Sequence, residues 1–211
     1  MKIDIPEPES LIICVSGPSG VGKDTVIREL QRRRPEMRHL ISMTTRCPRG
    51  KERDGVDYFF TSKDHFEKLL AKGEIVEYDQ YMDNYYGTPL APLNDVIDKG
   101  IDALLDVTVA GALAVKRKFP HAHTVFLLPP SIEALTERLR RRGTEKDQVI
   151  KKRVEAAANE ISQARDFDFV IVNDDLQNTV DTLYAICTAE RARPACQASN
   201  IAKILKEFRM T

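Results

Sequence analysis

The stretch Gly17–Thr25, GPSGVGKDT, follows the apolar run Leu11–Ser16, LIICVS, and leads into the amphipathic segment TVIRELQRR. Glycines in such a loop let backbone N–H groups converge on phosphate oxygens, and a helix that begins there adds partial positive charge. The stretch therefore predicts a buried strand, a phosphate-binding loop and a helix. Lys23 is expected to follow the β- and γ-phosphates of a nucleotide during transfer.

Asp24 departs from the usual form of this loop, in which a serine or threonine follows the lysine and ligates magnesium. An aspartate is also an oxygen ligand and suits the same hard cation. Its negative charge is tolerable near phosphates when the metal lies between them. Asp24 is therefore a candidate Mg²⁺ ligand, whereas Thr25 points elsewhere on the helix.

The composition is that of a globular protein with one sizeable core. The chain has 211 residues, of which 42% are hydrophobic. Lysine plus arginine and aspartate plus glutamate both number 32, so the net charge is zero and gives no global case for binding nucleic acid or a membrane.

The chain carries no recognisable targeting or cysteine-based signal. The opening MKIDIPEPES lacks the apolar core of a secretory signal, and no apolar run approaches the roughly 18 residues needed to span a bilayer. The four cysteines form no CxxC pair and have no histidine at metal-ligand spacing. We therefore expect a cytoplasmic protein. The sequence leaves open whether it is a monomer or a homo-oligomer.

Three further apolar runs have the length and composition of buried parallel strands. They are ALLDV at 103–107, TVFLLPP at 124–130 and FVIVN at 169–173, and each is followed by a turn or a polar helical pattern. This order predicts an α/β fold, a phosphate-loop kinase core in which helices flank a parallel sheet. The polar and aromatic stretch 42–92 contains the turn signals PRGKERDG and MDNYYG, and its length indicates an inserted lobe.

The remaining segments are helical in pattern. Residues 131–164 are rich in arginine and are interrupted by RRGTE at Gly143, which predicts two helices joined by a mobile tip. The tail 190–211 places apolar residues at helical spacing, which predicts a helix that packs on its own body or on a sister subunit. We expect one domain over 1–211, with its core at about 10–41, 93–130 and 165–190, the inserted lobe at about 42–92, a lid at about 131–164 and an accessory tail.

A second group of motifs is suited to a phosphorylated acceptor. Arg46 and Arg49, in TTRCPRGKERDGVDYFF, lie close enough to converge on one phosphate, and Tyr58 follows them. Arginine is the preferred residue for bidentate phosphate recognition. Glu77, in EYDQYMDNYYGTP, can accept two hydrogen bonds from adjacent donors.

Together with RLRRRGTE and VIVNDDL, these motifs and the phosphate loop resemble the guanylate kinase family. The matches run in order from about Leu11 to Glu190, nearly the whole chain. The resemblance implies transfer of the γ-phosphoryl group of ATP to GMP, and to dGMP, with Mg²⁺. It also implies a GMP-binding lobe and a closing lid around the core, and a place in purine nucleotide metabolism.

The resemblance also implies roles for single residues. The GMP phosphate would be bound by Arg46, Arg49, Tyr58 and Tyr86, and guanine by Ser42, Glu77 and Thr88, with Asp106 beside them. ATP would be bound by Gly17, Pro18, Ser19, Gly20, Val21, Gly22, Lys23, Asp24, Thr25 and Asn173. The lid would supply Arg138, Arg142 and Arg153, which form the catalytic set with Lys23 and Arg46.

The chemistry of the acceptor agrees with these roles. Guanine presents a ring N–H beside an exocyclic amine, and the carboxylate of Glu77 can receive both, whereas adenine lacks this donor pair. The acceptor phosphate is already an ionised oxygen nucleophile, so positioning and charge neutralisation carry the rate and no histidine or serine base is needed.

One strand departs from the family pattern. The family generally carries two acids spaced D-h-D, whereas this chain retains Asp106 and has Thr108 in the second place. Thr108 can still form a hydrogen bond, but a negative charge expected beside guanine is missing. This weakens the expectation of guanine selectivity more than that of the phosphate chemistry.

Two alternative functions share parts of the pattern. A phosphate-loop kinase of another small phosphorylated acceptor, such as a ribose phosphate, can carry the GKD variant, but it has no use for Glu77. A non-catalytic guanylate-kinase-like interaction module typically loses elements of the phosphate loop, whereas Gly22 and Lys23 are intact here.

Overall fold

A parallel sheet forms the centre of the protein in the computed structural model, which describes residues 10–81, 83–141 and 147–208. Its five strands lie in the order β2-β7-β1-β8-β9, and every neighbouring pair is parallel. The bounds are β1 Ile12–Ser16, β2 Arg38–Leu40, β7 Ala103–Asp106, β8 His123–Leu128 and β9 Phe169–Val172. The predicted α/β fold is confirmed. The short strand β2 was missed, because two of its three residues are polar and it lies at the sheet edge.

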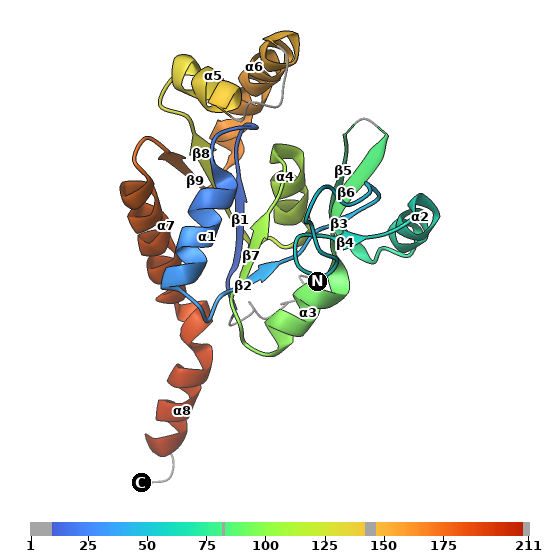
Figure 1. The fold of residues 1–211 in the computed structure, drawn as a ribbon. Coiled ribbons are helices and arrows are strands. Elements are labelled where there is room, and N and C mark those ends of the chain that lie inside the picture. The colour runs from blue at the N-terminus through green and yellow to red at the C-terminus, as the bar shows by residue number, and fades with distance from the viewer. Residues whose placement is uncertain (1–9, 82, 142–146, 209–211) are drawn as a thin grey trace.

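Helices cover both faces of this sheet, as Figure 1 shows. Side chains alternate along β1: Ile13 and Val15 face a cluster with α1 (Lys23–Arg33) and α7 (Leu176–Arg191). Ile12 and Cys14 face the opposite cluster, which includes α3 (Leu90–Asp98) and α4 (Val109–Lys118). Because both faces are buried, the strand is a continuous apolar run.

A smaller sheet lies beside the core in the order β4-β3-β6-β5. Its strands are β3 Met43–Thr44, β4 Phe59–Phe60, β5 Ile75–Tyr81 and β6 Asn84–Pro89, with helix α2 at Lys63–Ala71. Phe66 of α2 is buried and stacks on Tyr85 with ring centroids 5.2 Å apart. All of these elements fall within the stretch for which the sequence predicts an inserted lobe.

Two helices lie over the end of the core sheet at which the phosphate loop is found (Figure 1). Helix α5 spans Ile132–Arg141, α6 spans Asp147–Ser162, and a short 3₁₀ turn, η1, follows at Gln163–Asp166. Leu135 and Leu139 pack with Ile150 and Ala157 to form a small separate core. The predicted tip at Gly143 lies outside the described residues.

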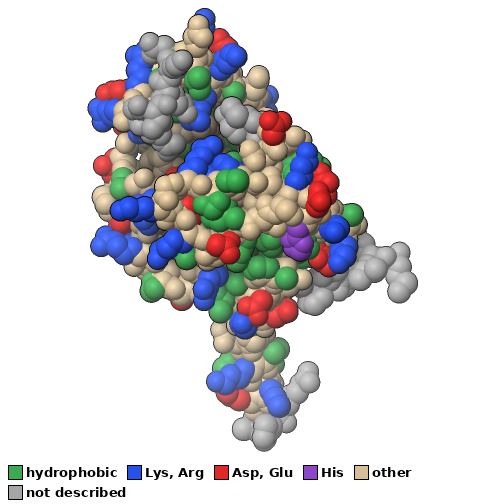
Figure 2. All heavy atoms as spheres, turned by 45° about the vertical axis from the view of Figure 1, so that its right-hand side comes forward, with side chains coloured by type: hydrophobic (Ala, Val, Ile, Leu, Met, Phe, Trp, Pro, Cys, Tyr) green, Lys and Arg blue, Asp and Glu red, His purple; other side chains and the backbone are tan. Residues whose placement is uncertain are grey.

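The tail forms a 3₁₀ turn, η2 (Pro194–Gln197), and helix α8 (Ala198–Phe208), which projects from the body in Figures 1 and 2. The predicted apolar stripe is exposed: Ile201 by 48%, Ile204 by 51%, Leu205 by 55% and Phe208 by 76%. Of the two expected partners of this face, its own body is therefore excluded for the stripe, and packing on a sister subunit stays a prediction. Within the described ranges, no helix combines the length and apolar character needed to cross a membrane.

Candidate active site

The phosphate loop joins the end of β1 to the start of α1. Gly22, which caps α1, has φ of 104° in the left-handed region, where a side chain is strained. No side chain caps the start of α1, so the N–H groups of Lys23 and Asp24 are available to an anion. The Nζ atom of Lys23 donates a hydrogen bond to the carbonyl of Gly17, 3.1 Å away, so the lysine folds over its own loop.

A cavity of about 270 Å³ opens beside the loop and brings most of the expected residues together. Of the residues expected from the sequence, those that line it are Pro18, Ser19, Gly20, Val21, Gly22, Lys23, Asp24, Ser42, Tyr58, Glu77, Tyr86 and Asp106. The others in the lining are Asp79, Gly87, Val107 and Thr108. We call this space the main cavity. It joins the phosphate loop to the small sheet and to the start of α4.

The carboxyl groups of Asp24 and Asp106 lie close together in this cavity, next to Lys23. Burial raises the pKa of Asp106 to about 6, the charge of Lys23 opposes this rise, and the charge of Asp24 adds to it. Two carboxylates in contact require a proton or a cation between them. The donor set therefore fits one divalent ion whose remaining ligands come from phosphate and water.

Glu77 lies on β5 at the wall of the main cavity and is only 7% exposed. Its Oε1 atom accepts a hydrogen bond of 2.8 Å from the hydroxyl of Thr88, which is buried on β6. Burial raises the pKa of Glu77 to about 7; the Thr88 hydrogen bond opposes the rise and the charge of Asp79 adds to it. The group is thus a buried acceptor with a fixed orientation.

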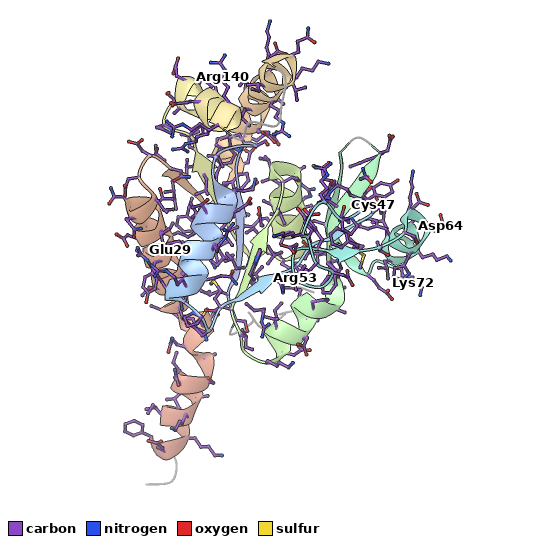
Figure 3. The ribbon with its side chains drawn as sticks, in the orientation of Figure 1. Glu29, Cys47, Arg53, Asp64, Lys72 and Arg140 are labelled. Atoms are coloured by element: carbon purple, nitrogen blue, oxygen red, sulfur yellow. The ribbon has the colours of Figure 1, made fainter. Side chains whose placement is uncertain are left out.

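Arg46 lies beside the aromatic side of the cavity but does not line it. Its guanidinium forms two hydrogen bonds of 2.9 Å with Glu52 and lies 5.4 Å from the centroid of the Tyr58 ring. The backbone N–H of Arg49 also donates to Glu52, while the Arg49 side chain is exposed. The two arginines therefore share one carboxylate through different groups. Cys47, which lies between them in the sequence, is on the side of the small sheet (Figure 3).

A second cavity of about 290 Å³ lies on the other side of the loop and is lined by Thr25, Arg138 and Asn173, among others. The amide of Asn173 donates to the carbonyl of Val21 at 2.7 Å. The guanidinium of Arg138 donates to the same carbonyl at 3.0 Å and to that of Asn173 at 2.9 Å. Arg138 is thus already bound to the main chain of the loop.

Helix α6 also reaches the loop. Burial raises the pKa of Glu160, and the charge of Lys23 and a hydrogen bond from the backbone N–H of Ser19 oppose this rise. Arg153, on the same helix, is half-buried, and Arg142 lies outside the described residues.

Comparison with known proteins identifies the family. The family model for guanylate kinase matches residues 9–190. The chain belongs to the guanylate kinase family. It is 43% identical over 186 residues to the guanylate kinase of Carboxydothermus hydrogenoformans, which covers 88% of this chain and 91% of that protein. It is 46% identical over 181 residues to that of Streptococcus pneumoniae, with 85% and 87% covered.

A solved structure gives the same result. The crystal structure of guanylate kinase from Anaplasma phagocytophilum matches with a TM-score of 0.74 at 33% identity, and the match covers 90% of each chain. The predicted membership of the guanylate kinase family is therefore confirmed, together with its α/β fold.

Three acidic residues near the site were not predicted from the sequence: Asp79, Glu52 and Glu160. Asp79 could have been found, because it lies two residues after Glu77 on one strand and so shares its face. Glu52 and Glu160 give no such local signal. Their contacts depend on how a turn folds back on Arg46 and how α6 meets the phosphate loop.

Glu77 and Asp106 are expected to make the stability of the fold depend on pH. Burial raises the pKa of Glu77 from 4.5 to about 7 and that of Asp106 from 3.8 to about 6. Between these values the folded protein holds protons that the unfolded chain has released, so this contribution to the unfolding free energy falls as pH rises. The Glu77→Gln/Asp106→Asn variant should therefore gain stability relative to the parent between about pH 5 and about pH 8.

Thermal melts of both ligand-free proteins across this pH range measure the effect. The measured quantity is the difference in Tm, because it cancels the titration of groups common to both. A difference that stays constant, or that shrinks as pH rises, would contradict the assignment of raised pKa values.

Proposed function

We propose that this protein is an ATP:GMP phosphotransferase that transfers the γ-phosphoryl group of ATP to GMP, and to dGMP, giving ADP and GDP or dGDP. One observation carries the proposal. The main cavity joins a phosphate loop, with Lys23, to a buried carboxylate acceptor, Glu77, held by Thr88. A phosphoryl donor on the loop and a purine with two adjacent N–H donors thus face one space.

The acceptor side follows from the small sheet. Glu77 receives the ring N–H and the exocyclic amine of guanine, and Thr88 keeps the carboxylate oriented. Ser42 lies on the same wall. Tyr58 and Tyr86, whose rings meet edge to face at 6.2 Å, bind the acceptor phosphate with Arg46 and Arg49. For Arg46, this role requires that the phosphate compete with Glu52 for the guanidinium.

The donor side follows from the core and the two helices above it. The triphosphate lies along residues 17–25, and Lys23 offsets the charge that develops on the transferred group. Arg138 and Asn173 hold Val21 and border the second cavity, where the adenine fits. We assign the core to about 10–41, 93–130 and 165–190, the GMP-binding lobe to about 42–92, the lid to about 131–164 and the tail to about 190–211.

The chemical step needs no protein base. The acceptor phosphate supplies an ionised oxygen, so the protein contributes alignment and charge neutralisation. Lys23 and Arg46 are expected to act at the phosphates, as are the lid arginines Arg142 and Arg153. The guanidinium of Arg138 already bonds to the loop backbone. Its first effect is therefore to fix the loop.

Mg²⁺ is proposed as the metal that accompanies ATP. Asp24, through its carboxylate or through a water, and Asp106 beside it would hold the ion. When bound, it neutralises phosphate charge. No group of three or more candidate ligands converges among the described residues.

The Asp24→Ala variant is expected to raise the Mg²⁺ concentration for half-maximal activity by about 10- to 100-fold. Asp24→Ser should recover part of this loss, because its hydroxyl is the usual ligand in such loops. Titrating turnover with Mg²⁺ at saturating ATP and GMP measures the effect. An unchanged requirement in Asp24→Ala would contradict the role.

An acceptor screen tests the proposed function. Release of ADP from Mg·ATP should be fastest with GMP, followed by dGMP, and much slower with AMP or ribose phosphates. Activity with a ribose phosphate but not with GMP would favour the kinase alternative. Inactivity with every acceptor, together with tight protein binding, would favour the interaction module. The family match over residues 9–190 favours neither alternative.

A cytoplasmic location stays a prediction. The oligomeric state is left open.

A further inference from the structure

The second carboxylate oxygen of Glu77, Oε2, lies against helix α4. While Oε1 is held by Thr88, the space beside Oε2 is bounded by Gly111 in the first turn of α4. A Cβ atom on Gly111 would lie 2.4 Å from Oε2 and 3.1 Å from Cδ of Glu77. Contacts under 3.0 Å are essentially never made by real Cβ atoms. The carboxylate therefore occupies the place of the missing side chain.

The backbone of α4 does not itself require a glycine at this position. Gly111 is not among the glycines with positive φ, and it lies inside a regular helix between Ala110 and Ala112. Alanine also has a higher helix propensity than glycine, by about 0.5–1 kcal/mol in a helix interior, so propensity does not favour a glycine here. The added Cβ would also lie 3.2 Å from Oγ1 of Thr108, but its shortest contact by far is with Glu77. The carboxylate is thus the main reason for the absence of a side chain.

Helix α4 is also hydrogen-bonded to the strand that carries Glu77. Thr108 caps it by accepting a hydrogen bond of 3.1 Å from the N–H of Gly111. At its far end, the Nζ atom of Lys118 donates to the carbonyl of Ile75, at the start of β5, at 3.2 Å. The helix and the strand that carries Glu77 are therefore tied together.

We propose that Gly111 is a positioning residue for base recognition, because its lack of a side chain is what lets the Glu77 carboxylate keep its place beside Thr88. The inference deepens the proposed function and rests on it. A methyl group at 111 pushes the carboxylate off this position by several tenths of an ångström or more. Two adjacent donors on a purine then meet at most one well-placed acceptor.

The Gly111→Ala variant tests this inference with GMP and IMP as acceptors, because IMP keeps the ring N–H and lacks the amine. The wild-type protein is assayed first, and failure to phosphorylate GMP would count against the proposed function itself. In Gly111→Ala, kcat/KM for GMP should fall by about 10- to 100-fold, mainly through KM, and by clearly less for IMP. The preference for GMP over IMP should shrink accordingly. The KM for ATP should stay unchanged.

A double-mutant cycle separates positioning from a general defect. In the Glu77→Ala background, Gly111→Ala should have no further effect on the ratio of GMP to IMP activity, since the group it displaces is gone. Ala110→Gly, at the neighbouring exposed position, is the matched control, and it should leave the ratio unchanged while slightly lowering Tm.

Three results would overturn the inference. One is a ratio within about twofold of wild type in Gly111→Ala. The second is an equal loss of kcat/KM for GMP and IMP. The third is a change in the GMP-to-IMP ratio that persists at full size in the Glu77→Ala background. If Gly111→Ala does not fold, the Glu77→Ala/Gly111→Ala variant decides: a folded double variant supports the clash with Glu77, and an unfolded one overturns it.

Discussion

Replacing Lys23 by methionine is expected to lower kcat for phosphoryl transfer by at least about a thousandfold. Methionine keeps the length of the side chain and removes its charge. The Nζ atom lies over the phosphate loop, 3.1 Å from the carbonyl of Gly17, in a cavity that is also lined by Asp24 and Asp106. Without Lys23, the transferred phosphoryl group faces these acids with no lysine to offset the negative charge.

The loss should appear chiefly in kcat, because the lysine follows charge that redistributes during transfer. Steady-state kinetics with saturating Mg·ATP and GMP measure it. Arg28→Met is the control, since it removes one positive charge from the exposed side of the same helix. A Lys23→Met variant that retains kcat within about tenfold of wild type would contradict the proposed role of the loop.

The second large effect is expected at Glu77. Glu77→Ala should lower kcat/KM for GMP by about a hundred- to a thousandfold, because two donors of the bound guanine lose their acceptor in a buried site. The fall in kcat/KM should be much smaller for IMP, and the KM for ATP should not change. The loss of stability should be small compared with this loss of activity, since burial already disfavours the charged form of Glu77.

Glu74→Ala provides the comparison, because Glu74 is exposed and lies just before the same strand. It removes the same kind of side chain at the surface and should leave both acceptors unaffected. An equal fall for GMP and IMP in Glu77→Ala would argue that the residue supports the fold of the small sheet and does not read the base.

The site shows where local sequence is informative. The phosphate loop is recognisable because strand, glycines, lysine and helix are consecutive, and each acts through its own backbone geometry. Glu77 and Thr88 were found through resemblance to a family. The contacts of Arg138 with Val21 and of Asp106 with Asp24 join residues more than 80 positions apart, and no local pattern encodes them.

The tail illustrates the same limit. Its helical spacing predicted α8 correctly, because periodicity reports which side chains share a face. Periodicity does not report what that face meets. The structure leaves Ile204 and Phe208 exposed, which excludes the body of the same chain as the partner of this face and leaves a sister subunit as the expected one.

By itself, the sequence determined that this chain is an α/β protein with a phosphate loop at Gly17–Thr25 and the family motifs around it. Strand runs, turn glycines and helix periodicity are local consequences of backbone sterics and burial. Only the tertiary structure decided what surrounds Glu77. The space for its carboxylate is made by Gly111, 34 positions away on another element, because close packing is set by which surfaces meet. Likewise, the aspartate in GKDT acquired a partner, Asp106, only when two strands were brought side by side.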